Sequence, residues 1–302
     1  ANASLAFDNL RKGFYYKKIP KWNIDVIKLM IIIVYFYAGI AKINSDWLFN
    51  AMPLKIWMSS KYHYPIIGPF LESNTVHYLM SWGGMLYDIL IPFLLVNKNL
   101  RTIGFVLVII FHLITKILFP IGMFPYIMIL VVLIFFDENK YKKLVKFFFS
   151  LFNKLIKHKG HFTYKKFYSN KYNNLITFIF ICFFILQIII PIRHIIYPGE
   201  LLWHEQGYRF SWRVMLIEKI GIANFKIVDK CNQSSFYINN ENYLTPYQEK
   251  QMSFQSDFIL EYAHFLGDMF STDSCKVEVY VDNFVALNGR PSKRFIDNSR
   301  DL

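Results

Sequence analysis

The sequence predicts a mainly α-helical, multi-pass membrane protein that carries a small α+β domain outside the membrane. Of its 302 residues, 54% are hydrophobic and 31 are Phe, and the mean hydropathy is +0.27. A soluble domain is usually about 45–50% apolar. Helices need roughly 20 apolar residues to cross a bilayer. Five runs approach this length, at 24–43, 75–96, 102–119, 121–136 and 174–195.

These runs suggest two domains, a transmembrane helical domain at 1–198 and a small external domain at 199–302. The fourth run is short and follows a proline, so we expect it to tilt or to begin as a re-entrant turn. The segment 47–60 is too short to span. We expect it to lie in the membrane interface, with Trp47 and Trp57 at headgroup level.

The net charge of +13 is unevenly distributed, which predicts the orientation. Residues 1–23 carry five Lys/Arg and one Asp, the link 97–101 carries two basic residues, and the loop 137–173 carries ten Lys and two acids. These segments share one side if all five runs span, and their charge places them in the cytoplasm. The mildly acidic residues 199–302 then lie outside, and a bacterial cytoplasmic membrane is the expected location. No nucleic-acid-binding motif accompanies the charge, so the basic loop predicts contact with the lipid bilayer and not with nucleic acid.

A lysine ends the first run, within IVYFYAGIAKINSDWL (33–48). An ammonium group at the end of a membrane-length helix is costly unless it reaches water or a partner. Lys42 is therefore a candidate site residue. The alternative is structural, because a lysine at this position can snorkel to the interface and complement the negative end of the helix dipole.

Three more polar residues lie inside predicted spans. Asp88 lies in the middle of the second run, and His112 and Lys116 share one helix face because they are four residues apart. Ionisable residues in spans usually face the bundle interior and mark a site. The structural alternative is that Asp88 pairs with Lys116 or His112 to join two helices. Gly83 and Gly84 predict a close helix approach on the second run.

The alternating direction of the runs brings these groups to one end of the membrane domain. Lys42, Lys116 and His194 fall at or near outer ends of runs, His112 lies one turn deeper than Lys116, and Asp88 lies deeper still. We therefore expect one cavity in the outer half of the membrane, open to lipid and to the outside. Such a cavity suits a lipophilic cofactor and a secreted polypeptide.

The external domain has strand and helix signals. Strand alternation and a Thr-Pro helix start predict the order strand, strand, helix, strand, at 225–229, 234–240, 246–270 and 276–287. Cys231 and Cys275 lie in this domain, in an oxidising compartment, so a disulfide between them is possible. The cysteine spacing fits neither a CxxC motif nor a zinc site, and no metal is expected.

Four ordered segments resemble the vitamin K-dependent gamma-glutamyl carboxylase family in its bacterial form. They are IVYFYAGIAKINSDW (33–47), FHLITKILFPIGMFPYIMI (111–129), WHEQGYRFSWRVM (203–215) and VALNGRPSKRFIDNSRDL (285–302). The chain begins with Ala and has no initiator Met, so we expect it to be a piece of a longer protein. The resemblance implies that the first spans of the family precede it and that a β-rich C-terminal region follows.

The resemblance implies an integral membrane enzyme of the lyase class. Such an enzyme couples the oxygen-dependent epoxidation of vitamin K hydroquinone to the carboxylation of Glu in a secreted peptide or protein, with carbon dioxide as co-substrate. Lys42 matches the catalytic base, which acts only as a neutral amine, the form that burial favours. The remaining implied site residues are His112, Asp88 and Trp47 for the cofactor and His194, Tyr208, Trp212 and Arg213 for the peptide substrate.

Two other functions remain open. The first is a non-enzymatic membrane protein, such as a transporter or an immunity-type factor, on the same helical fold. It would tolerate loss of the Lys42 charge. The second is a quinone-binding redox protein, which would depend on a quinol but would fix no carbon dioxide into peptide.

Overall fold

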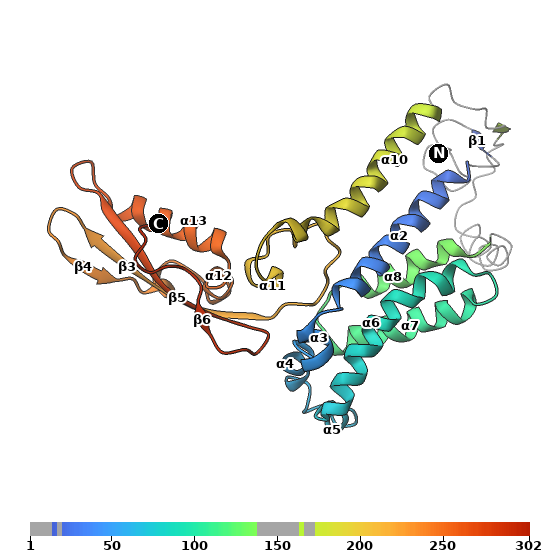
Figure 1. Cartoon of the computed structure of the whole chain (residues 1–302), viewed down its shortest axis with the longest axis horizontal. Helices are drawn as coiled ribbons and strands as arrows, with labels where there is room; N and C mark the ends of the chain where they lie inside the picture. The colour runs from blue at the N-terminus through green and yellow to red at the C-terminus, as the bar shows by residue number, and fades with distance from the viewer. Residues whose placement is uncertain (1–13, 17–19, 138–162, 166–172) are drawn as a thin grey trace, which may run out of the picture. The chain divides into compact units, whose positions relative to one another are not determined.

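The computed structural model describes residues 14–16, 20–137, 163–165 and 173–302 (Figure 1). Much of the predicted basic N-terminal segment and basic loop lies outside these described residues. Two compact units can be distinguished by their internal contacts. Unit 1 comprises 1–43, 78–201 and 205–214, and unit 2 comprises 44–77, 202–204 and 215–302. Because contacts and not sequence define these units, the sequence domains 1–198 and 199–302 stay predictions.

The predicted fold class is confirmed. Among the described residues, four helices are long and apolar enough to cross a membrane. They are α2 (Trp22–Ala41), α6 (Asn74–Val96), α7 (Arg101–Leu118) and α10 (Asn173–Ile189), which continues as the 3-10 helix η2 (Ile190–Ile196). A small sheet with its own helices forms most of the C-terminal part.

The helices α2, α6 and α7 pack with alternating direction. Ile31 of α2 shares a buried cluster with Leu95 near the end of α6, whereas the last turn of α2 lies against the middle of α6. Between α6 and α7, the rings of Tyr87 and Phe111 stack with centroids 3.9 Å apart. At the opposite end of this pair, Arg101 Nε donates to the carbonyl of Leu95 at 2.8 Å. Each helix therefore runs antiparallel to the preceding one.

The fourth predicted run forms a shorter helix than the others. It comprises α8 (Phe124–Val132) and the 3-10 turn η1 (Leu133–Phe135). Phe124 lies against His112 near the end of α7, with ring centroids 6.0 Å apart, and Phe136 lies 5.4 Å from Phe105 near its beginning. The segment thus returns along most of α7, beside which it lies in Figure 1.

The helix α10 runs parallel to α2. Trp22 and Phe180 lie with ring centroids 5.3 Å apart near one end, and Tyr37 Oη donates to the carbonyl of Ile188 at 2.7 Å near the other. Two short strands that precede these helices, β1 (Phe14–Tyr16) and β2 (Thr163–Lys165), also pair in parallel. The helices α2, α7 and α10 therefore point one way and α6 and α8 the other, although α8 with η1 is shorter than the four helices that are long enough to span.

Unit 2 contains an antiparallel sheet with the order β4-β3-β5-β6. Its strands are β3 (Lys219–Asp229), β4 (Ser235–Tyr237), β5 (Val277–Leu287) and β6 (Lys293–Arg294). Alternate residues of β3 and β5 face two helices, and Phe225, Ile227, Val279 and Val281 are at most 2% exposed. This alternation is the pattern that the sequence analysis used, and the predicted strand, strand, helix, strand order is present.

The predicted helix 246–270 consists of two helices, which corrects the prediction. They are α12 (Pro246–Met252) and α13 (Ser256–Phe270). Thr245 caps α12 through a capping box with Gln248, as the Thr-Pro signal predicts. The break follows because the carbonyl of Ser253 accepts a buried hydrogen bond of 2.7 Å from Asn283 Nδ2 in β5. That carbonyl is then not used by a continuous helix.

The segment between the first two spans belongs to unit 2. It forms α3 (Ser45–Asn50), α4 (Leu54–Ser59) and α5 (Gly68–Leu71). Trp47 is 4% exposed, and Trp57 Nε1 donates to Glu218 Oε2 at 2.8 Å, at the approach to β3. The predicted placement among lipid headgroups is therefore wrong for the buried Trp47. Trp57 is half-buried, and its place in the membrane interface stays a prediction.

A glycine allows α2 and α6 to approach closely. A Cβ atom added at Gly39 would lie 2.6 Å from Ile89 Cγ1 and 2.9 Å from the Ile89 backbone nitrogen. Gly83, one of the two glycines (with Gly84) for which the sequence predicted this role, has no heavy atom from outside its own helix turn within 4 Å of such a Cβ. The close contact therefore lies at the end of α2, because the rotation of α6 turns Gly83 away from its neighbours.

We predict that Gly39→Ala destabilises the membrane domain by about 1–3 kcal/mol, because the added methyl group has no room beside the α6 backbone. Gly83→Ala is the matched control, and its thermal unfolding temperature in detergent should stay close to that of the parent protein. Equal unfolding temperatures for the two variants would contradict the close packing.

The predicted orientation of the chain in the membrane can be tested by cysteine labelling. The Lys/Arg bias places the link that contains Lys98 in the cytoplasm and the strand β4 outside. Both Lys98 and Tyr237 are exposed. In a Cys182→Ser background, Lys98→Cys and Tyr237→Cys should react with a membrane-impermeant maleimide from opposite sides. Reaction of both sites from the same side would exclude this orientation.

Candidate functional site

The buried ion pair between Lys42 and Asp88 is the centre of the candidate site. Lys42 Nζ lies 2.7 Å from Asp88 Oδ2, and the two residues are 6% and 5% exposed. Lys42 Nζ also donates to the carbonyl of Ala38 at 3.2 Å. Because helical side chains lean toward the helix N-terminus, the lysine at the end of α2 reaches back along its own last turn to α6.

This pair identifies the partner of Asp88, which the sequence left open. Asp88 pairs with Lys42, and not with Lys116 or His112. The ammonium group of Lys116 instead donates to the carbonyl of Gly122 at 3.3 Å. The Lys42 side chain is only 8% exposed, so it does not snorkel to the surface of unit 1. Each charge of the pair depends on the other, because removing one partner of a buried pair leaves an uncompensated charge.

A cluster of aromatic residues continues from the ion pair into the helix bundle. Tyr35 lies seven residues before Lys42, on the same face of α2, and Tyr87 directly precedes Asp88. The ring centroids of the two tyrosines are 6.0 Å apart. Tyr35 Oη lies 3.0 Å from His112 Nε2, in a buried hydrogen bond. Of the predicted residues, Lys42 and Asp88 thus contact each other, and His112 contacts Tyr35, which sequence reasoning did not select.

One ring nitrogen of His112 is available to hydrogen-bond a ligand. The residue is 3% exposed, and its Nδ1 atom is buried and has no hydrogen-bond partner among the described residues. Neutral histidine carries one donor and one acceptor nitrogen. With Nε2 paired to Tyr35, Nδ1 remains able to bond a ligand in either tautomer. Beside it, the rings of Tyr87 and Phe111 stack on each other, and the Phe111 ring meets the imidazole edge-on.

A second group of predicted residues gathers at the end of η2. Arg213 Nη2 lies 3.2 Å and 3.3 Å from the two ring nitrogens of His194. Burial, with a smaller contribution from the charge of Glu205 and an opposing one from Arg213, raises the pKa of Tyr208 to about 12. Burial also lowers the pKa of Arg213. The structure therefore brings together His194, Tyr208 and Arg213 of the predicted substrate-binding set, with Trp212 adjacent in the chain.

The backbone of this segment is held in an unusual conformation. Phe210 and Trp212 have φ angles of 58° and 56°, in the left-handed region that bulky residues rarely adopt. Gly207 has a φ of +81°, and a Cβ added there would lie 2.8 Å from His194 Cα. The loop thus lies directly against η2. Such strained conformations cost about 1–3 kcal/mol each and occur most often at functional sites.

Trp47, the remaining predicted cofactor residue, belongs to unit 2, where its neighbour Asp46 forms a buried anchor. Arg290 Nη2 lies 2.7 Å from both carboxylate oxygens of Asp46, and Asn288 Nδ2 donates to Oδ2 at 3.0 Å. Asp46 is 4% exposed. Sequence reasoning gave these residues no role. The available signal was that Asp46 follows the candidate lysine and that Asn288 and Arg290 lie in another of the resembling segments.

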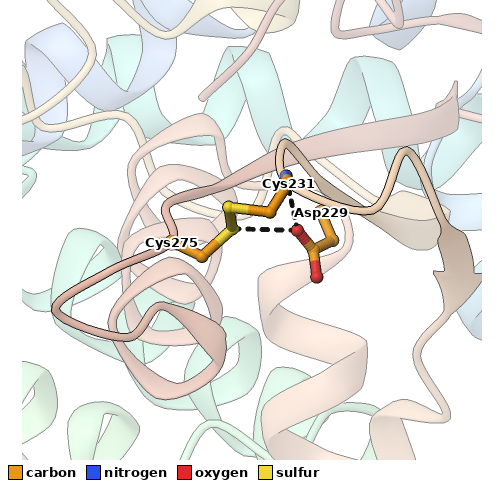
Figure 2. Close-up of side chains that lie close together, drawn as sticks. All are labelled: Asp229, Cys231 and Cys275. Carbon is orange, nitrogen blue, oxygen red and sulfur yellow. Dashed lines mark hydrogen bonds between the residues drawn. A yellow bond between two sulfur atoms is a disulfide. The ribbon is translucent and has the colours of Figure 1, made fainter.

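Three residues with metal-ligand chemistry lie together at the other end of the sheet (Figure 2). The ligand-type atoms of Asp229, Cys231 and Cys275 are within 4.8 Å of one another. The two cysteines are joined by a disulfide, with their Cα atoms 6.0 Å apart. Their sulfurs therefore offer no thiolate to a metal. Figure 2 shows the Asp229 carboxylate turned toward the bridge, where Oδ1 accepts from the Cys231 backbone nitrogen at 2.7 Å.

Two protein-family domains match the chain, one in its N-terminal part and one in its C-terminal part. Residues 1–140 match the HTTM domain, and residues 172–302 match the vitamin K-dependent gamma-carboxylase lumenal domain. No solved structure matches the chain significantly. The matched domains, together with the helices long enough to span a membrane, indicate a gamma-carboxylase-like membrane protein. The chain belongs to the vitamin K-dependent gamma-glutamyl carboxylase family.

We predict that Arg290→Ala destabilises unit 2 by about 1–3 kcal/mol, because the buried carboxylate of Asp46 loses its charged donor. Arg294→Gln is the matched control. Arg294 pairs with Asp282 at 3.4 Å, with both side chains more than 40% exposed, so its loss should cost less than about 1 kcal/mol. Denaturant unfolding followed by Trp fluorescence measures both effects, and equal losses would contradict the anchoring role.

Proposed function

We propose that the protein is a vitamin K hydroquinone epoxidase and gamma-glutamyl carboxylase, with Lys42 as its catalytic base. The observation that carries the proposal is the buried Lys42–Asp88 pair, which adjoins the aromatic cluster around His112. We also propose that the enzyme lies in a bacterial cytoplasmic membrane with unit 2 outside. The chemistry of the site supports this proposal at three points.

The first point is the protonation of the pair. A base must present a neutral amine, and Asp88 Oδ2, 2.7 Å from Lys42 Nζ, is placed to hold the proton that the ammonium gives up. Burial destabilises both charges. It therefore lowers the free energy needed to convert the ion pair into a neutral amine beside a protonated carboxyl group. The carbonyl of Ala38 fixes the direction of the amine. Asp88 thus positions the base and stores its proton.

The second point is the fit of a quinol. A naphthoquinol is flat and apolar and carries two hydroxyl groups. The aromatic rings of Tyr87 and Phe111 lie beside His112, whose Nδ1 is a hydrogen-bonding atom with no partner among the described residues. We infer that His112 holds one quinol oxygen and that Tyr35 fixes the imidazole ring. When bound, the hydroquinone supplies the two electrons and the reaction with oxygen that drive removal of a γ-proton from peptide Glu.

The third point is recognition of the peptide. Arg213 carries a guanidinium group beside His194, and its Nε atom is buried without a hydrogen-bond partner among the described residues. A guanidinium group binds a carboxylate in a fixed two-point geometry. We infer that Arg213 binds the Glu side chain and that Tyr208 and Trp212 flank it.

We predict that Lys42→Ala in the full-length protein lowers epoxide formation from vitamin K hydroquinone by at least about 100-fold, because the base is lost. A small exogenous amine should restore part of the activity. Lys42→Arg should also be inactive, because a guanidinium group keeps its proton. Lys116→Ala is the matched control on the neighbouring helix and should retain activity.

The double variant Lys42→Met with Asp88→Leu separates catalysis from folding. It removes both buried charges, so the helices should remain folded while the activity is absent. Full activity in Lys42→Arg would exclude Lys42 as the base. If the parent protein forms no epoxide, the non-enzymatic alternative is favoured. Epoxide formation without incorporation of labelled carbon dioxide into a Glu peptide would favour the redox alternative.

A further inference from the structure

A pocket of about 520 Å³ lies between α12 and α13 in unit 2, apart from the residues of the proposed active site. It is large enough for a drug-sized ligand. Its lining is formed mainly by aromatic and aliphatic side chains, together with one carboxylate and two amides. The residues are Tyr243, Leu244, Tyr247, Gln248, Gln251, Met252, Phe258, Glu261, Tyr262 and Phe265.

Five of these residues are aromatic, and three of their rings contact one another. Tyr262 and Phe265 stack with centroids 6.0 Å apart and an angle of 15° between planes, and Tyr243 meets Phe265 edge-on at 6.2 Å. Tyr247 is 72% exposed and stands at the open side. The faces of aromatic rings carry negative charge density and attract cations, alkylated ammonium groups in particular.

The charged residues around the pocket also favour a cationic ligand. Residues 240–270 contain five acidic residues, Glu241, Glu249, Asp257, Glu261 and Asp268, and one basic residue, Lys250. Glu249 accepts a hydrogen bond of 3.0 Å from Asn240 Nδ2. Glu261 lines the pocket, is exposed, and makes no ion pair or side-chain hydrogen bond with the described residues. A carboxylate beside aromatic rings favours a cationic ligand and disfavours an anionic one.

Tyr262 adds a hydrogen-bond donor. The residue is 6% exposed, and its hydroxyl group is buried without a hydrogen-bond partner among the described residues. Burial, with smaller contributions from Tyr243 and Glu249, raises its pKa to about 12, so the hydroxyl keeps its proton at neutral pH. A buried donor without a partner is costly. An oxygen atom of a ligand would supply the missing acceptor.

We propose that this pocket binds an amphiphilic organic cation, with an alkylated ammonium head, an oxygen acceptor a few atoms away and an apolar body. The head lies against the aromatic rings near Glu261, and the apolar body covers Leu244, Met252 and Phe258. None of these residues belongs to the proposed active site, so binding here does not depend on the proposed reaction.

The test uses two probes of nearly equal shape. Hexanoylcholine carries the charged head, an ester oxygen and an apolar chain, and 3,3-dimethylbutyl hexanoate is its uncharged isostere. Isothermal titration calorimetry on the full-length protein in nanodiscs of choline-free lipid, with empty nanodiscs as the reference, measures both. Hexanoylcholine should bind at least about five-fold more tightly than the isostere. Equal affinities, or no binding of either probe, would overturn the proposal.

Three variants locate the site. Glu261→Gln and Tyr247→Leu should each weaken hexanoylcholine binding by at least about five-fold and leave the isostere unchanged, because they remove the charge and the ring face. Both residues are exposed, so these variants should fold. Glu241→Gln, an exposed acid outside the lining, should have no effect. If Glu261→Gln binds hexanoylcholine as tightly as the parent protein does, the assignment is wrong.

A phosphate-bearing probe separates a free cation from a lipid headgroup. Dihexanoylphosphatidylcholine has the same trimethylammonium head but also a negatively charged phosphate group. The acidic surroundings of the pocket should weaken its binding relative to hexanoylcholine. Binding of both probes with the same affinity would contradict the role assigned to the acidic residues.

Discussion

Two opposite charges buried together determine the arrangement of the membrane part. Lys42 and Asp88 lie on different helices, and neither charge tolerates burial without the other. The pair therefore fixes the height of α6 along α2, since a shift of one helical turn would move the two groups apart by about 5.4 Å. Gly39 permits the close approach that a 2.7 Å contact requires. The alignment of Tyr35 with Tyr87 follows from the same registration.

The residues of the proposed active site lie on two kinds of backbone, regular helices and a loop. The lysine, its carboxylate and His112 are held by regular helices, whose backbone hydrogen bonds restrict their movement. Arg213 and Trp212 instead lie on a loop with left-handed backbone angles at bulky residues. A base that acts on a buried lipophilic molecule gains from a rigid position, whereas a side chain that receives a polypeptide must lie near the outside. The helical position of Lys42 thus agrees with its proposed role as the base, and the loop position of Arg213 agrees with its proposed role in binding the peptide.

Much of the fold was predictable because its signals are local. Apolar length identified the long spans, alternation identified β3 and β5, and the Thr-Pro pair identified the start of α12. Lys42 was selectable because a charge at the end of a span has few explanations. The partner of Asp88 was not predictable, because hydropathy gives the depth of a residue and not the rotation of its helix. For the same reason the sequence could not show that Gly83, unlike Gly39, faces away from its neighbours. The break at Ser253 depends on a hydrogen bond from a strand 30 residues away.

The anchor between Asp46 and Arg290 has a consequence for biosynthesis. The partners are separated by 244 residues, and the aspartate is made first. At about 5–20 residues per second, roughly 12–50 s pass before the ribosome adds the arginine. During this time the short helices after α2 cannot complete their packing, because the sheet that covers them does not yet exist. This part of the chain must therefore stay soluble, or be held by a chaperone, until the arginine has been added, even though α2 and α6 on either side of it are translated well before the sheet is complete.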